Sequence, residues 1–188
     1  MEGTRILVTG FGPFEDVTEN VTEAVAPALG YPFRILDVAF RAVDEFLESL
    51  DPGSFDVLLA LGHDKRAEKV RIETVGRNRI GERPDVRGEV HGPGPIDPRG
   101  PNQIAASLWR APELLQETDR WVPSTDAGGY LCGYMLYRSL QAFPDKLVGF
   151  LHLPPAVAVG VTMQVDRIKE ILSLAISDSP FAQPPVGS

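Results

Sequence analysis

The chain has 188 residues, of which 43% are hydrophobic and 23% are charged, and its formal net charge is −8. These values fit one globular domain over residues 1–188 and exclude a disordered or fibrous chain. The negative charge argues against nucleic acid or an anionic membrane as a partner, because both attract cationic surfaces.

The first part of the chain alternates short apolar strands with helices. Strands are predicted at residues 5–9, 33–40 and 56–61, and helices at 20–29 and 42–50. The strand at 56–61 is apolar throughout, which is typical of a central strand covered on both faces. This alternation predicts an α/β fold with a mainly parallel sheet and helices on both sides.

The second part of the chain departs from strict alternation. Residues 68–75 alternate apolar and polar side chains, as a strand with two different faces does. The segment 76–101 is rich in proline and glycine and is expected to be a long, exposed loop, and the tail from about residue 177 is expected to be loosely held. The remaining predicted elements are a strand at 147–153 and helices at 104–117, 130–140 and 161–176.

The only cysteine of the chain, Cys132, follows a glycine-containing turn at residues 127–129 and begins a predicted helix. The unpaired N–H groups and the positive end of the helix dipole favour a thiolate there, as a nucleophile requires. A buried, unreactive cysteine fits this stretch equally well. A single cysteine cannot form an internal disulfide, and the N-terminus lacks the apolar run of a signal peptide, so we expect a cytoplasmic protein.

Other candidate site residues stand at the ends of predicted strands. Glu73 and His152 would supply a carboxylate and an imidazole, which with Cys132 meet the needs of thiol hydrolysis. A solvated Glu73 and a core His152 remain alternatives at this point. Phe11 and Phe14 follow the first strand and either line an apolar pocket or belong to the core.

Four separated segments together resemble the pyroglutamyl peptidase I family, also called pyrrolidone carboxyl peptidase. They occur in the family's order and span residues 5–154 approximately. The segments are Gly10-Phe-Gly-Pro-Phe14 followed by Asn20, Gly62 through Glu73 to Asn78, Ser124 through Tyr130-Leu131-Cys132, and Gly149-Phe-Leu-His152-Leu-Pro154.

The resemblance implies a three-layer α/β/α sandwich with a mainly parallel mixed sheet. It also implies a cysteine exopeptidase that removes an N-terminal pyroglutamyl residue from peptides, needs no metal or cofactor and forms a homotetramer. Cys132 would be the nucleophile, His152 the base and Glu73 the residue that orients the imidazole, while Arg83 would stabilise charge near the thiol. The apolar slot for the lactam ring would be lined by Phe11, Phe14, Tyr130 and Leu131.

The chain differs from the family pattern beside this slot. Where the family has Gly-Gln-Ala-Gly-Gly the chain has Gly62-His-Asp-Lys-Arg66, so His63 takes the place of the glutamine that recognises the lactam. Gly133 follows the cysteine where the family has asparagine. The alternatives are therefore a catalytically altered or inactive member that binds or cleaves another small lactam or amide, and, more remotely, a nucleobase enzyme without a phosphate-binding loop.

Overall fold

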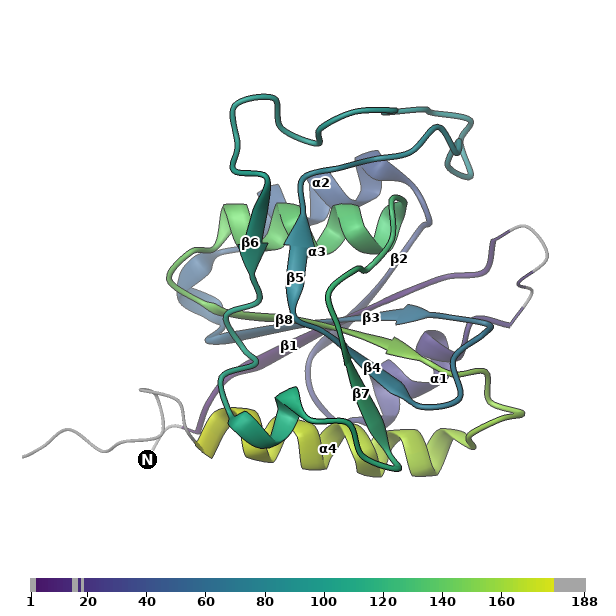
Figure 1. The fold of residues 1–188 in the computed structure, drawn as a ribbon, viewed down its shortest axis with the longest axis vertical. Helices are drawn as coiled ribbons and strands as arrows, with labels where there is room; N and C mark the ends of the chain where they lie inside the picture. Colours follow the sequence, from purple (N-terminus) through teal and green to yellow (C-terminus); the bar gives the residue numbers. More distant parts are fainter. Residues whose placement is uncertain (1–2, 15–16, 18, 178–188) are drawn as a thin grey trace, which may run out of the picture.

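A computed structural model gives the structure of the chain and describes residues 3–14, 17 and 19–177 (Figure 1). The tail that we expected to be loosely held lies outside the described residues from residue 178 on. The strands are β1 (Ile6–Phe11), β2 (Phe33–Leu36), β3 (Val57–His63), β4 (Val70–Glu73), β5 (Val75–Arg77), β6 (Gln103–Ala105), β7 (Trp121–Ser124) and β8 (Leu147–Leu153). The helices are α1 (Val21–Ala28), α2 (Phe40–Ser49), α3 (Leu131–Ala142) and α4 (Val161–Ser177), with short 3₁₀ turns η1 (Pro52–Ser54) and η2 (Pro112–Leu115).

The central sheet has six strands in the order β2-β1-β3-β8-β4-β7. β2, β1, β3 and β8 are parallel, whereas β4 runs antiparallel to β8 and β7 runs parallel to β4. β5 and β6 form a separate antiparallel pair. The prediction of a mainly parallel mixed sheet is thus confirmed.

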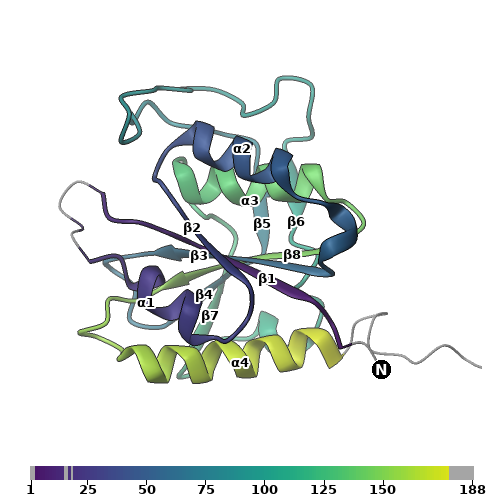
Figure 2. The ribbon, with the colours of Figure 1, turned by 180° about the vertical axis from the view of Figure 1, so that it is seen from behind.

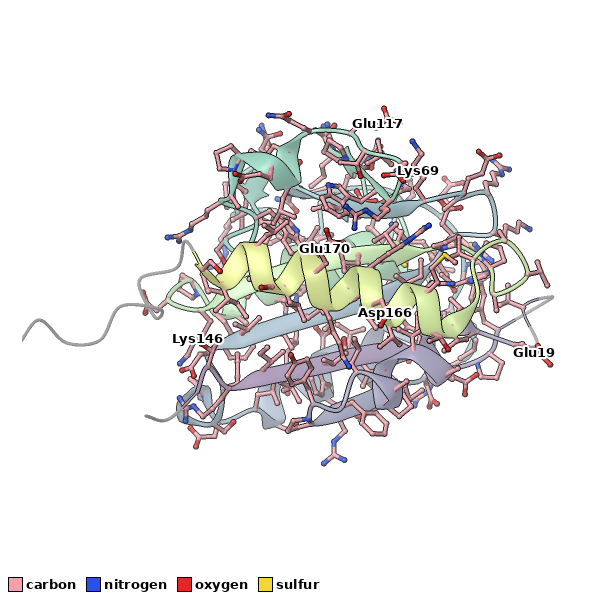
Figure 3. All side chains as sticks on the ribbon, turned by 90° about the horizontal axis from the view of Figure 1, so that it is seen from below. Glu19, Lys69, Glu117, Lys146, Asp166 and Glu170 are labelled. Atoms are coloured by element: carbon pink, nitrogen blue, oxygen red, sulfur yellow. The ribbon has the colours of Figure 1, made fainter. Side chains whose placement is uncertain are left out.

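Helices cover both faces of the sheet, with α2 and α3 on one face and α1 and α4 on the other (Figures 1 and 2). The view from below shows α4 lying across the strands (Figure 3). β3 explains why both faces need cover: Val57, Leu59 and Leu61 join the core cluster that contains α1 and α4 side chains, while Leu58 and Ala60 join the cluster of α2 and α3. These layers confirm the α/β/α sandwich. None of the helices described here is long and apolar enough to cross a bilayer.

The helix predicted at residues 104–117 is wrong. The chain forms β6 there, followed by an irregular stretch and η2. The backbone N–H of Ala106 donates to the carbonyl of Thr74, between β4 and β5, at 2.9 Å, and that of Leu108 donates to the carbonyl of Val148 in β8 at 3.1 Å, so neither is available to a helix. Pro112, whose ring disrupts a helix interior, begins the 3₁₀ turn.

The segment between β5 and β6 runs above α2 and α3 (Figures 1 and 2). Its Asp85 is buried and accepts a hydrogen bond from the Phe40 N–H at 3.0 Å, which caps α2 from outside the helix. The strand predicted at 33–40 is therefore too long: β2 ends at Leu36, and α2 begins at Phe40, whose N–H this contact satisfies. Burial disfavours the charged carboxyl, but backbone hydrogen bonds outweigh that effect and hold the pKa of Asp85 below its ordinary value.

Candidate active site

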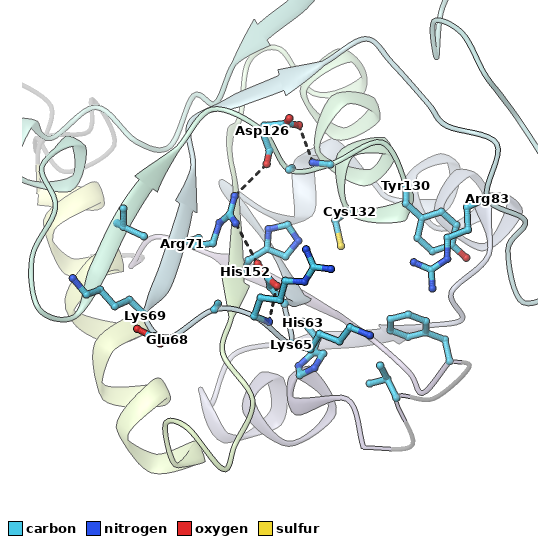
Figure 4. Close-up of a pocket in the computed structure, with 18 of the residues that line it drawn as sticks. His63, Lys65, Glu68, Lys69, Arg71, Arg83, Asp126, Tyr130, Cys132 and His152 are labelled. Carbon is cyan, nitrogen blue, oxygen red and sulfur yellow. Dashed lines mark hydrogen bonds and ion pairs between the residues drawn. The ribbon is translucent and has the colours of Figure 1, made fainter.

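The candidate residues share one face and one edge of the sheet because of strand alternation. In β8, Val148 and Phe150 belong to the core on the α2 and α3 side, so His152 faces the same side. In β4, Val70 and Ile72 belong to the opposite core, so Glu73 also faces α3. The first turn of α3 carries Cys132 to the same place (Figure 4).

His152 and Glu73 are in direct contact. Nδ1 of His152 lies 2.8 Å from Oε1 of Glu73, and both side chains are almost entirely buried, with 9% and 0% of their surface exposed. Nε of Arg71 lies 3.3 Å from the same carboxylate oxygen. Because Nδ1 is engaged by the carboxylate, Nε2 is the ring nitrogen left for Cys132 and a substrate.

The charge state of His152 depends on its two neighbours. Burial disfavours the imidazolium and by itself lowers the pKa. The negative charge and hydrogen bond of Cys132, followed by the hydrogen bond and charge of Glu73, outweigh burial and raise the pKa of His152 to about 10. When Cys132 is a thiolate, the imidazole beside it is protonated at neutral pH, and the two form the ion pair that a thiol hydrolase uses.

Cys132 is held close to the end of β3. A Cβ added at Gly62 would lie 2.9 Å from the Cys132 sulfur and 2.7 Å from the Phe150 ring. Because glycine has no Cβ, the backbone of β3 at Gly62 can approach the sulfur closely. Cys132 is the second residue of α3 and so lies in the first helical turn, whose N–H groups lack partners within the helix.

A cavity of about 780 Å³ opens in front of Cys132 and His152. Aromatic rings and cations line it beside the cysteine: the Arg83 guanidinium lies 4.5 Å from the Tyr130 ring centroid and 5.6 Å from that of Phe14. The Tyr130 hydroxyl donates to the Pro84 carbonyl at 3.0 Å, which ties this wall to the segment above α2 and α3. Figure 4 shows Arg83 and Tyr130 side by side across the cavity from His152.

The structure separates the other predicted site residues into two groups. His63 lines the cavity, and burial is the main cause that lowers its pKa, so the ring is neutral at pH 7. Its buried Nδ1 has no hydrogen-bond partner among the described residues. Phe11 and Leu131 do not line the cavity; they are 3% and 1% exposed and belong to the core cluster against which Phe14 and Tyr130 pack.

Reasoning from sequence missed two residues that shape the site. Arg71 contacts Glu73, Asp64 and Ser124 at once, and the i, i+2 spacing of Arg71 and Glu73 on one strand face was the available signal. Trp109 donates its indole N–H to the Glu73 carbonyl at 3.1 Å, but it lay inside the wrongly predicted helix. Within the part of the chain that the structure describes, no group of three His, Cys, Asp or Glu side chains is placed to hold a metal ion.

Comparisons with known proteins agree on one family. The model of the pyroglutamyl peptidase family matches residues 4–177. The pyrrolidone-carboxylate peptidase of Pyrococcus furiosus is 32% identical over 168 residues, covering 80% of each chain, and that of Halalkalibacterium halodurans is 32% identical over 174 residues, covering 81% of this chain and 84% of the relative. The crystal structure of pyrrolidone carboxyl peptidase from Thermus thermophilus gives a TM-score of 0.74 at 33% identity, covering 90% of this chain and 99% of that one. The chain therefore belongs to the pyroglutamyl peptidase family.

Proposed function

We propose that Cys132, His152 and Glu73 carry out in this chain the reaction of its family, the removal of an N-terminal pyroglutamyl residue from a peptide. The chain is a cysteine hydrolase by its family, and its relatives are named pyrrolidone-carboxylate peptidases. The observation that supports the assignment of residues is the contact chain from the Glu73 carboxylate through the imidazole to the sulfur.

The first half of the reaction forms a thioester. The Cys132 thiolate attacks the pyroglutamyl carbonyl carbon, a C–S bond forms, and the carbonyl oxygen becomes an oxyanion that N–H groups at the start of α3 stabilise. As the C–N bond breaks, His152 gives its proton to the leaving amine. Water, deprotonated by His152, then hydrolyses the thioester, and pyroglutamate leaves while the thiolate is restored.

Glu73 acts through His152. Its carboxylate fixes the imidazole with Nδ1 turned away from the substrate and stabilises the imidazolium. Arg71 holds the carboxylate in place through Nε, and Trp109 holds the backbone of the same residue. These contacts keep the pair in one geometry without touching the substrate.

The lactam ring is proposed to bind between the aromatic side chains beside Cys132. Phe14 and Tyr130 line the cavity and offer apolar faces, with Phe11 and Leu131 supporting them in the core cluster. The neutral His63 can hydrogen-bond the lactam as an amide side chain would. Arg83, held against both rings, supplies positive charge near the developing oxyanion.

Hydrolysis of a fluorogenic pyroglutamyl amide tests the proposal. Wild type is expected to release the fluorophore, and both iodoacetamide and Cys132→Ser are expected to abolish the release. Ser139→Ala, a buried hydroxyl elsewhere on α3, is the matched control and is expected to remain active. Turnover by Cys132→Ser equal to wild type would contradict the role of the thiol.

We also propose that the enzyme is a cytoplasmic homotetramer. The family resemblance supports the oligomer, and a thiolate nucleophile in a chain with one cysteine suits a reducing compartment. Light scattering during size-exclusion chromatography checks the oligomer, and a mass other than that of four chains contradicts it.

A further inference from the structure

A charged turn at residues 64–67 forms part of the cavity wall. It follows β3, whose last residue is His63, and precedes β4. The Ala67 N–H donates to the Asp64 carbonyl at 3.0 Å, so Lys65 and Arg66 occupy the two tip positions. All four side chains of this 64–67 turn line the cavity that contains Cys132.

Asp64 builds the 64–67 turn and anchors it to the active site. Its Oδ1 accepts the Arg66 N–H at 2.9 Å, and its Oδ2 lies 3.2 Å from the guanidinium of Arg71. Its own N–H donates to the carbonyl of Leu153, the residue after His152, at 3.0 Å. The tip residues are therefore presented by a fixed backbone rather than by a free loop.

The 64–67 turn lies on the side of the cavity that receives the leaving peptide. His152 must protonate the leaving amine, so the peptide beyond the scissile bond lies on the imidazole side of Cys132. Strand register places the turn there, because Gly62 is aligned with His152 and the turn begins two residues later. In Figure 4 Tyr130 lies on the side of Cys132 that is away from His152.

Several charged side chains on this side of the cavity pair with one another. Lys69 pairs with Glu117 at 2.8 Å, and the two side chains meet in the view from below (Figure 3). Asp64 is matched by Arg71 within the site. The tip carries two further cationic side chains, Lys65 and Arg66, and both are exposed.

We propose that the 64–67 turn is a specificity site for a carboxylate on the leaving peptide, with Arg66 and Lys65 as the groups that recognise it. The carboxylate is either the side chain of an acidic residue directly after pyroglutamate or the free C-terminus of a pyroglutamyl dipeptide. Arginine matches a carboxylate with two parallel hydrogen bonds, which gives direction as well as charge. The inference rests on the proposed function, since that function defines which side the leaving peptide occupies.

The test compares four substrates that share pyroglutamate: pyroglutamyl-Glu-amide, its neutral match pyroglutamyl-Gln-amide, pyroglutamyl-Ala with a free carboxylate, and pyroglutamyl-Ala-amide. Wild type is expected to show a kcat/KM about fivefold higher for a carboxylate substrate than for its amide match, the scale of one exposed ion pair. Arg66→Gln is expected to lose this preference. Arg34→Gln, an equal loss of charge on β2 outside this cavity, is expected to keep it.

The first pair of substrates reports on the side-chain carboxylate and the second on the terminal one, so a preference in either pair supports the proposal and identifies the source. Equal rates within both pairs, or an unchanged preference in Arg66→Gln, overturn it. If no substrate is hydrolysed, the proposed function fails, and binding decides the inference separately. Calorimetry of both substrate pairs on Cys132→Ser then supports it if the carboxylate ligand of either pair binds more tightly than its amide match, and overturns it if binding is equal within both pairs.

Discussion

Replacing Glu73 by glutamine removes the charge beside the imidazole while nearly preserving the shape of the side chain. In the structure Glu73 is fully buried, and its Oε1 contacts His152 Nδ1 at 2.8 Å and Arg71 Nε at 3.3 Å. A neutral glutamine leaves the arginine and the imidazolium near each other without the carboxylate between them. Catalysis is expected to fall because the ion pair at the sulfur loses its support.

The size of the effect follows from the burial of the pair. Breaking a buried, hydrogen-bonded charge pair costs about 3–5 kcal/mol. If the whole of that cost appears in the transition state, kcat/KM falls by about two to nearly four orders of magnitude. Burial lowers the pKa of His152, and Cys132 together with Glu73 raises it to about 10, so the pKa falls when Glu73 is neutral.

Two measurements check the Glu73→Gln prediction. Turnover of a fluorogenic pyroglutamyl amide gives kcat/KM, and the rate of alkylation by iodoacetamide as a function of pH gives the range in which the ion pair exists. The alkaline limit of that range is expected to move to lower pH in Glu73→Gln. Glu170→Gln is the matched control, because it removes from α4 a carboxylate that is paired with Arg120. Wild-type kcat/KM and an unmoved pH limit in Glu73→Gln would refute the reasoning.

Three other outcomes are expected. Gly62→Ala places a Cβ 2.9 Å from the Cys132 sulfur, so the sulfur must move. Because a misplacement of about 1 Å can lower a rate about a hundredfold, kcat/KM is expected to fall by about that factor while the circular dichroism spectrum stays native. Wild-type activity of Gly62→Ala would contradict this prediction. Trp109→Phe leaves the buried carbonyl of Glu73 without its donor, so the free energy of unfolding measured in urea is expected to fall by about 1–3 kcal/mol. An unchanged free energy of unfolding would contradict this prediction. The pKa of His152 is raised from 6.5 to about 10, so the contribution of its protonation to stability is present below pH 6.5 and is lost as the pH rises toward 10. The difference in free energy of unfolding between wild type and His152→Gln is therefore expected to be smaller at pH 10 than at pH 6.5.

Local patterns in the sequence predicted the elements that form the sheet core. The strand predicted at 147–153 matches β8 residue for residue, because an apolar run ended by two prolines has few other readings. The cysteine at the start of α3 was predicted from the glycine turn before it. The alternation of strands and helices predicted a mainly parallel sheet with helices on both sides, and the family resemblance implied the three-layer α/β/α sandwich.

Contacts between distant segments could not be predicted in the same way. β7 contains Pro123 and lies at the edge of the sheet, so its sequence has neither the length nor the composition of a central strand. The stretch 104–117 has apolar residues at helical spacing, but the N–H groups of Ala106 and Leu108 bond to carbonyls of distant segments, those of Thr74 and Val148. Local periodicity does not reveal such partners.

The site shows the same limit. Residue types and their places at strand ends indicated Glu73 and His152, but the role of Arg71 depends on β4 running antiparallel to β8, which aligns Arg71 with His152. A parallel pairing would have given a different neighbour. The sequence therefore indicated the chemistry, whereas the register supplied the arginine that holds the carboxylate.

The structure also explains the glycine that follows the nucleophile, where the family pattern has asparagine. Gly128 adopts a left-handed conformation with φ of 85°, and the turn brings its carbonyl oxygen against residue 133, where an added Cβ would overlap it. Asparagine at position 133 would require another path for the turn at 127–129. Gly133 thus belongs to the way this chain presents Cys132, so the difference at this position is structural and does not remove the sulfur or the α3 N–H groups from the site.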